Sequence, residues 1–169
     1  MYEDEASFWL DGTLHQTWAR VGVQPRVDTF GMRKTAHIFG ALTLEERPRF
    51  HYQFAPVFNG HTFGEFLRLL VRRSRRTLFL IIDNSPCHNL DAEGKAWLAA
   101  NRHRLELFRL PSYSPEFNPI EGVWKQTKKR TTHNTFFRTT DERDAALTAT
   151  FETFRAQPSL IAAQVARFV

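Results

Sequence analysis

Residues 110–125 read LPSYSPEFNPIEGVWK, a stretch with three prolines spaced four residues apart. Each proline fixes φ at about −65°, and a helical pattern follows in which Glu121 occupies the first turn. With Asn118 as N-cap and Pro119 as the first helical residue, Glu121 also fits the third position of a capping box. The stretch therefore predicts a stiff loop that delivers one carboxylate, which serves either as a helix cap or as a functional acid.

The composition around this stretch predicts one globular α/β domain with a substantial core. The chain has 169 residues, of which 42% are apolar, including sixteen Phe and four Trp. This length supports a single domain. The net charge of +5 and a sequence pI near 9.8 are compatible with a polyanionic partner.

The cysteine content and the hydropathy predict a cytoplasmic protein without a membrane partner. Cys87 is the single cysteine, which excludes an internal disulfide and a thiolate-rich metal site. The sequence also lacks an apolar run approaching the ~20 residues that span a bilayer.

The N-terminal third predicts an antiparallel meander of strands. A strand is expected over residues 2–10, and its period of two places Asp4 on the same face as Ala6, Phe8 and Leu10. Parity therefore favours Asp4 over the adjacent Glu5 as a functional acid. An Asp-Gly turn and a second strand follow, which together indicate a hairpin. The further strands are expected over residues 16–23, 34–44 and 50–58.

Residues 77–82, TLFLII, form a continuous apolar run that ends on Asp83 and Asn84. Such a run is typical of a strand buried on both faces at the centre of a sheet. An open α/β sheet usually places its chemistry where such a strand ends. An Asx turn at Asp83 would explain the same two residues.

The second half of the chain predicts mainly helices. On the helix expected over 119–132, Glu121 and three lysines share one side, which is either a solvated face or a face that follows phosphates. The arginines at positions 72–76 either cap a helix dipole or contact DNA. A strand is expected over 105–110, and the helices over 62–74, 91–101, 119–132, 139–157 and 158–169; the lysines are Lys125, Lys128 and Lys129.

Three acids stand out by position: Asp4 in the first strand, Asp83 at the end of the apolar strand and Glu121 after the stiff loop. Carboxylates crowded at one sheet end repel one another unless cations neutralise them. Oxygen ligands suit Mg²⁺ or Mn²⁺, and two ions ~3.5–4 Å apart support phosphoryl chemistry. Each acid alone could instead be a cap or a turn residue.

Three strings carry a family resemblance: residues 3–25, EDEASFWLDGTLHQTWARVGVQP, residues 80–88, LIIDNSPCH, and residues 110–125. They resemble the catalytic domain of DDE-type transposases of the mariner-like superfamily, specifically its bacterial insertion-sequence branch. The resemblance implies a ribonuclease H-like fold, with a mixed five-stranded sheet whose first three strands are antiparallel, flanked by helices. It assigns residues 1–169 to the catalytic domain, without the helix-turn-helix region that precedes this domain in relatives.

The resemblance also implies a mechanism. The acids Asp4, Asp83 and Glu121 would bind two Mg²⁺, with Mn²⁺ as a substitute, to cut DNA at the element ends and to transfer the 3′-hydroxyl strand into target DNA. Asn84 and His88 would have supporting roles, and the early Trp18 and Pro25 structural ones. The expected partners are DNA and a second copy of the chain, and the expected location is the bacterial cytoplasm at the nucleoid. The three lysines would supply salt-sensitive DNA contacts.

Two alternatives to a transposase stay open from the sequence. A nuclease on the same fold would cut DNA without joining it. A catalytically silent DNA-binding domain or domesticated remnant would keep the acids without performing the reaction.

Overall fold

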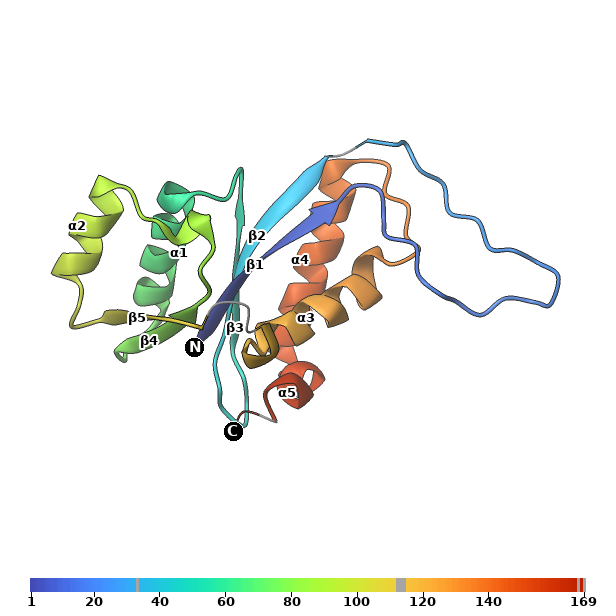
Figure 1. The fold of residues 1–169 in the computed structure, drawn as a ribbon. Coiled ribbons are helices and arrows are strands. Elements are labelled where there is room, and N and C mark those ends of the chain that lie inside the picture. The colour runs from blue at the N-terminus through green and yellow to red at the C-terminus, as the bar shows by residue number, and fades with distance from the viewer. Residues whose placement is uncertain (33, 112–114, 167, 169) are drawn as a thin grey trace.

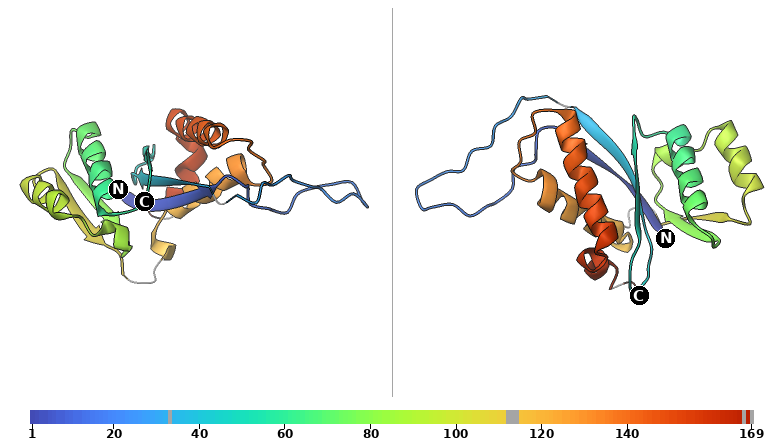
Figure 2. Two further views of the ribbon diagram at one scale, coloured as in Figure 1. Left: turned by 90° about the horizontal axis from the view of Figure 1, so that it is seen from above. Right: turned by 180° about the vertical axis from the view of Figure 1, so that it is seen from behind.

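The computed structural model describes residues 1–32, 34–111, 115–166 and 168. A five-stranded sheet lies between two groups of helices, with α1 and α2 against one face and α3, α4 and α5 against the other (Figures 1 and 2). The strand order is β3-β2-β1-β4-β5. The strands are β1 (Tyr2–Trp9), β2 (Thr35–Leu42), β3 (Phe50–Ala55), β4 (Leu78–Ile82) and β5 (Leu105–Arg109).

The sheet is mixed, as predicted. Strand β1 pairs antiparallel with β2, with Asp4 opposite Gly40, and β2 pairs antiparallel with β3. Strands β4 and β5 join in parallel, and the β1–β4 pairing places Tyr2 beside Ile81. The first three strands therefore form the expected antiparallel meander, and the parallel β1–β4 pairing brings the start of β1 beside the end of β4.

The segment between β1 and β2 is a long arm, so the strand expected over residues 16–23 is wrong. Beyond the buried Leu10, the chain up to residue 32 runs out from the body of the protein as an extended loop, whose base contacts His133 and Phe136 (Figures 1 and 2). Trp18 is fully exposed at 101%, and Pro25 is also exposed, so neither packs into the core. Residues 16–23 do not form the second strand because β1 and β2 pair directly with each other over all eight of their residues. The apolar side chains of the arm have no sheet face left to cover.

The sheet separates two apolar cores. On one side Ala6 and Phe8 of β1 pack with helices α3 to α5, and on the other side Phe39 and Leu80 pack with α1. The strand buried on both faces is β2. The prediction that residues 77–82 fill this role was wrong, because Phe79 of β4 is 56% exposed and no helix among the described residues covers it.

The helices follow the predicted order, with shifted ends. Helix α1 starts one turn earlier than expected, because its capping box pairs Asn59 with Thr62. Asp91 caps α2 through Gly94 N, at 2.7 Å. The helices are α1 (Gly60–Arg73), α2 (Ala92–Ala100), α3 (Ile120–Thr127), which continues as the π-helix Lys128–Thr132, α4 (Thr140–Ala156) and α5 (Ser159–Val165). Among the described residues, no helix has the length and apolar character needed to cross a bilayer.

Gly40 lets helix α3 approach the sheet beside Asp4. A Cβ atom at this position would lie 2.5 Å from Cη2 and 2.6 Å from Cζ2 of Trp124. The indole therefore rests directly on the backbone of β2, next to the strand position that pairs with Asp4.

We predict that Gly40→Ala destabilises the protein by about 1–3 kcal/mol, because the added methyl group must displace a buried indole in a packed core. The measurement is the free energy of unfolding in urea. Gly64→Ala is the matched control, since its Cβ would meet its nearest neighbour, the flexible end of Arg68, at an ordinary 3.4 Å. Equal stability of the two variants would contradict the packing described.

Candidate active site

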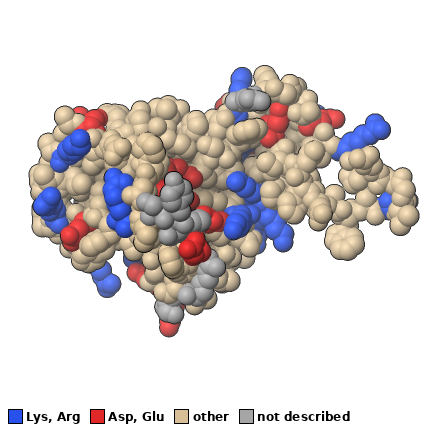
Figure 3. All heavy atoms as spheres, in the orientation of Figure 1, with Lys and Arg blue, Asp and Glu red and all other residues tan. Residues whose placement is uncertain are grey.

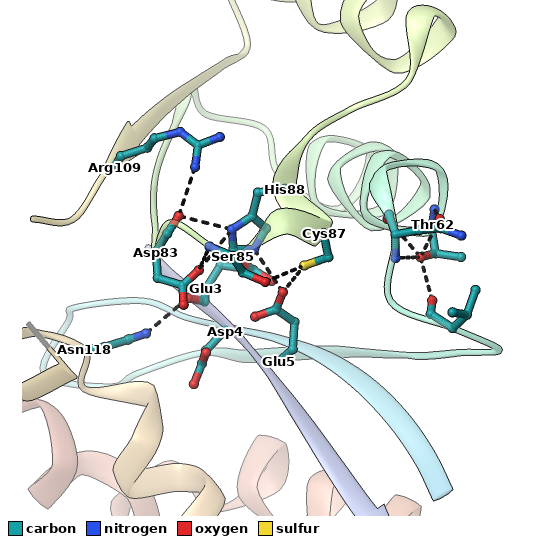
Figure 4. Close-up of polar contacts among 12 residues, drawn as sticks. Glu3, Asp4, Glu5, Thr62, Asp83, Ser85, Cys87, His88, Arg109 and Asn118 are labelled. Carbon is teal, nitrogen blue, oxygen red and sulfur yellow. Dashed lines mark hydrogen bonds and ion pairs between the residues drawn. The ribbon is translucent and has the colours of Figure 1, made fainter. Parts of the chain in front are cut away.

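Asp4 and Asp83 meet where β1 and β4 lie side by side. Oxygen atoms of Asp4, Glu5 and Asp83 all lie within 4.8 Å of one another (Figure 4). The donor set consists of carboxylate oxygens, which suits a hard divalent cation such as Mg²⁺. Two of the three acids expected to act together are thus adjacent, and Glu5 joins them.

Asp4 points toward helix α3, on the face that strand parity predicted. The indole Nε1 of Trp124 donates a hydrogen bond to Asp4 Oδ2 at 3.0 Å. Burial, reinforced by the charge of Glu5, raises the pKa of Asp4 to about 7. A carboxyl group with such a raised pKa favours a nearby cation, because the cation offsets the cost of its negative charge.

Asp83 is held at the end of β4 by its neighbours in the following loop. Its Oδ1 accepts a hydrogen bond from Ser85 N at 2.7 Å, which is the Asx turn considered from the sequence. Nδ1 of His88 lies 3.1 Å from the same oxygen. Asn84 donates through Nδ2 to Leu110 O at 2.9 Å and ties the ends of β4 and β5 together. The turn and an exposed functional acid are therefore compatible roles for Asp83.

Glu121 lies in the first turn of α3, but the expected capping box is absent. The N-cap is Pro119 and makes no side-chain capping bond. The buried Asn118 still contacts the helix start, because its Oδ1 accepts a hydrogen bond from Ile120 N at 3.4 Å. Its Nδ2 donates to Glu3 O at 3.3 Å, so it also ties the helix start to β1. The Glu121 carboxylate lies 3.8 Å from Lys125 Nζ. It is not a member of the carboxylate group around Asp4 at the 4.8 Å limit. Residues 112–114 of the preceding loop lie outside the described residues.

Sequence reasoning missed the buried partner of His88. The side chains of Glu3 and His88 are both completely buried, and His88 Nε2 lies 2.9 Å from Glu3 Oε2 (Figure 4). Burial alone would lower the pKa of His88, but its close contacts with Cys87 and Glu3 and the acidic charges around it raise the value to about 11. The alternation of Glu3 and Glu5 on the strand face opposite Asp4 was the signal that could have found this cluster.

The predicted lysine face continues from Glu121 along α3 into the π-helix. Figure 3 shows acidic side chains near the centre of one face of the protein and basic side chains beside them, over the C-terminal part of α3. Lys125 and Lys129 are exposed, and Lys128 is partly so. The basic stripe therefore starts next to the acids.

The sequence itself matches a family over most of its length. Residues 1–143 match the family described as DDE superfamily endonuclease. The chain belongs to this family. None of the curated protein sequences matches the chain.

Solved structures of transposases and an integrase share the fold of this DDE endonuclease. The Mos1 mariner paired-end complex with Mg matches with a TM-score of 0.63 at 13% identity, over 97% of this chain and 52% of that one. The catalytic domain of Mos1 mariner transposase matches with a TM-score of 0.55 at 12% identity, over 97% and 78%. The catalytic core of BIV integrase matches with a TM-score of 0.50 at 17% identity, over 72% and 76%. The chain spans about half the length of the first Mos1 chains it matches, such as the one in the complex with the left transposon end (54%).

We predict that this DDE endonuclease loses stability as the pH rises from about 5 to about 8 in the absence of divalent cations. Burial raises the pKa of Glu3 from 4.5 to about 8, against the opposing effect of His88, and that of Asp4 rises from 3.8 to about 7. The folded chain thus binds more protons than the unfolded chain in this range. Both contributions are complete below the unfolded pKa values and are lost as pH approaches 7 and 8. The raised pKa of His88 acts in the same direction above its ordinary value of 6.5.

The measurement is the urea midpoint at several pH values in a chelating buffer. Glu3→Gln should flatten the decline, because a neutral amide replaces the buried acid, whereas the exposed Glu106→Gln should keep the slope of the unmodified protein. A midpoint that rises across this range would show that the buried acids are not protonated in the folded state.

Proposed function

We propose that the chain is the catalytic domain of a metal-dependent DNA transposase, which cleaves DNA at the ends of an element and joins the freed 3′-hydroxyl to target DNA. The observation that carries the proposal is the meeting of Asp4, near the start of β1, with Asp83, which directly follows the end of the adjacent parallel strand β4, in a member of a DDE endonuclease family. The shared fold with Mos1 transposase in its paired-end and strand transfer complexes supports the same activity.

Asp4, Asp83 and Glu121 are the proposed metal ligands, for two Mg²⁺ that Mn²⁺ can replace. The carboxylate donor set and the raised pKa of Asp4 fit a divalent cation. The Mos1 paired-end complexes with Mg and with Mn support this choice. When bound, such ions supply positive charge that activates an attacking oxygen and stabilises the leaving oxygen.

The side chains around the acids orient them for this chemistry. Trp124 fixes one oxygen of Asp4, and Ser85 N fixes one oxygen of Asp83. Arg109 Nη1 donates to Asp83 O at 3.3 Å and holds the strand end itself. Since Trp124 is buried in α3, the Asp4 carboxylate needs little reorganisation when DNA arrives.

The proposed reaction has two steps, cleavage and strand transfer. In cleavage, the oxygen of a water bonds to phosphorus, the bond from phosphorus to the 3′-oxygen breaks, and that oxygen leaves as a hydroxyl with a proton from the water. In strand transfer, the same 3′-oxygen attacks a target phosphate, and a target 3′-oxygen leaves with the displaced proton. Neither step needs a covalent protein intermediate.

We expect Asp83→Asn to lower Mg²⁺-dependent nicking of element-end DNA by at least about 10³-fold, since it removes one charged ligand from the group that stabilises the transition state. Nicked product on a denaturing gel is the measurement. Asp141→Asn, an exposed position at the start of α4, is the matched control and should retain activity. Equal nicking by the unmodified chain and Asp83→Asn would remove the catalytic assignment.

A pre-cut substrate separates the transposase from the two alternatives. Given an element end with a free 3′-hydroxyl, a transposase yields joined products, and a nuclease on the same fold yields only cuts. A silent DNA-binding remnant yields neither, although it still binds the DNA.

Lys125, Lys128 and Lys129 are the proposed phosphate contacts. Their position beside the acids would place the DNA backbone across the candidate active site. Replacing all three by Gln should reduce the slope of log Kd against log salt by about 2–3, since each phosphate contact contributes about 0.9. Fluorescence anisotropy with duplex DNA at several salt concentrations measures the slope.

The control for this prediction removes charge from the far side of the protein. Lys95→Gln combined with Arg102→Gln changes two exposed residues on and after α2, and should leave the slope unchanged. An equal effect of both sets would assign the salt dependence to net charge rather than to the lysine face.

The proposed assembly is a homodimer on paired DNA ends. The arm between β1 and β2 supports it, because Trp18 and Val21 are fully exposed there and an exposed apolar group favours a partner surface. The assignment of residues 1–169 to the catalytic domain alone and the bacterial insertion-sequence origin belong to the same proposal.

A further inference from the structure

Four side chains meet behind the carboxylate group, on the face of β1 opposite Asp4. They come from two places, Glu3 and Glu5 on β1, and Cys87 and His88 in the 3-10 helix after β4 (Figure 4). His88 Nε2 lies 2.9 Å from Glu3 Oε2 and 3.3 Å from Glu5 Oε1. Cys87 Sγ contacts the same Glu5 oxygen. The His88 nitrogen, the Cys87 sulfur and a Glu5 carboxylate oxygen lie within 4.8 Å of one another, and the Glu3 carboxylate adjoins this group through His88.

Glu3 has no adequate hydrogen bonding in this position. It is 0% exposed, and neither of its carboxylate oxygens has a hydrogen-bond partner among the described residues. His88 Nε2 lies close to it, but its hydrogen is not aligned for a hydrogen bond. Burying a carboxylate without compensation costs several kcal/mol. A cation bound in the cluster would supply that compensation.

The contacts of His88 indicate which nitrogen faces the cluster with its lone pair. Nδ1 lies 3.1 Å from Asp83 Oδ1 and 3.2 Å from Asp83 O, and both atoms are acceptors. Nδ1 must therefore carry a hydrogen. Nε2 then faces two carboxylates with either a second proton or a metal ion. A histidine that binds a metal usually donates its other N–H to a carboxylate or a carbonyl group, which is the arrangement seen at Asp83.

The donor types select the class of metal. Mg²⁺ and Ca²⁺ take oxygen ligands, whereas thiolate, imidazole and carboxylate together are the ligands of tetrahedral zinc sites. Glu5 belongs both to this cluster and to the group around Asp4, but its contacts with Cys87 and His88 place its Oε1 on the sulfur-containing side.

We propose that Glu3, Glu5, Cys87 and His88 form a separate site for a zinc-class divalent cation. The bound ion would balance the buried carboxylates, join β1 to the loop after β4, and fix His88 so that it orients Asp83. The inference rests on the cluster itself and does not require the proposed transposase reaction.

Cobalt provides the direct test, because a Co²⁺–thiolate bond gives a charge-transfer absorption in the near ultraviolet. Cys87 is the single cysteine, so this absorption reports on the proposed site alone. The full chain, reduced and held in excess Mg²⁺, is titrated with Co²⁺ and then with Zn²⁺. We expect the band to saturate at one Co²⁺ per chain and to be abolished by Zn²⁺. Absence of the band at saturating Co²⁺ would overturn the proposal and leave a protonated His88 as the cation.

Two variants locate the bound ion. Glu3→Gln removes a ligand and should weaken Zn²⁺ binding by about 100-fold or more, beyond the 10- to 100-fold that loss of an outer-shell partner costs. Asp4→Asn lies on the opposite face of β1 and should leave Zn²⁺ binding unchanged. The reverse pattern would place the ion among the carboxylates around Asp4 and overturn the proposal. If Glu3→Gln fails to fold by circular dichroism, the cobalt spectrum of the unmodified chain still decides.

Discussion

Strand β1 carries three consecutive acids, Glu3, Asp4 and Glu5, into the centre of the sheet, and the rest of the site compensates their charge. Successive side chains of a strand point to opposite faces, so the two sides need different partners. Asp4 receives the indole N–H of Trp124 on one side, and Glu3 lies against His88 on the other. Asn118 then ties the backbone of Glu3 to the start of α3. The three acids of β1 therefore determine which residues lie against each of its two faces.

Much of the fold and part of the site could be predicted from the sequence. The period-2 pattern placed Asp4 on the correct face, and the apolar run before Asp83 marked the end of β4. Helix boundaries were predictable where a cap is local, as at Asp91. The grouping of Glu121 with the other acids remains a prediction, because its distance from them depends on how α3 packs and on the loop before it, neither of which is encoded by local spacing.

Two wrong strand predictions and one missed contact also depend on tertiary packing rather than on local sequence. Apolar residues in the arm satisfy the pattern of a strand, but β1 pairs directly with β2 over eight residues, so residues 16–23 do not lie between them in the sheet. The run in β4 reads as buried on both faces, yet no helix of the described chain covers Phe79 or Phe108, which are 56% and 45% exposed. The Glu3–His88 contact joins residues 85 positions apart, so it becomes visible only in three dimensions.

The arm between β1 and β2 also has a consequence for the order of folding. Pairing β1 with β2 closes a loop of 25 residues, 10–34, whereas pairing β2 with β3 closes only the seven residues 43–49. Loop entropy favours the shorter closure by about 1 kcal/mol. The β2–β3 hairpin thus forms at lower cost, and the acidic strand joins a partly assembled sheet. Since a further doubling of the arm would cost only about 0.6 kcal/mol, its length and sequence are free to evolve with its partner rather than with the fold.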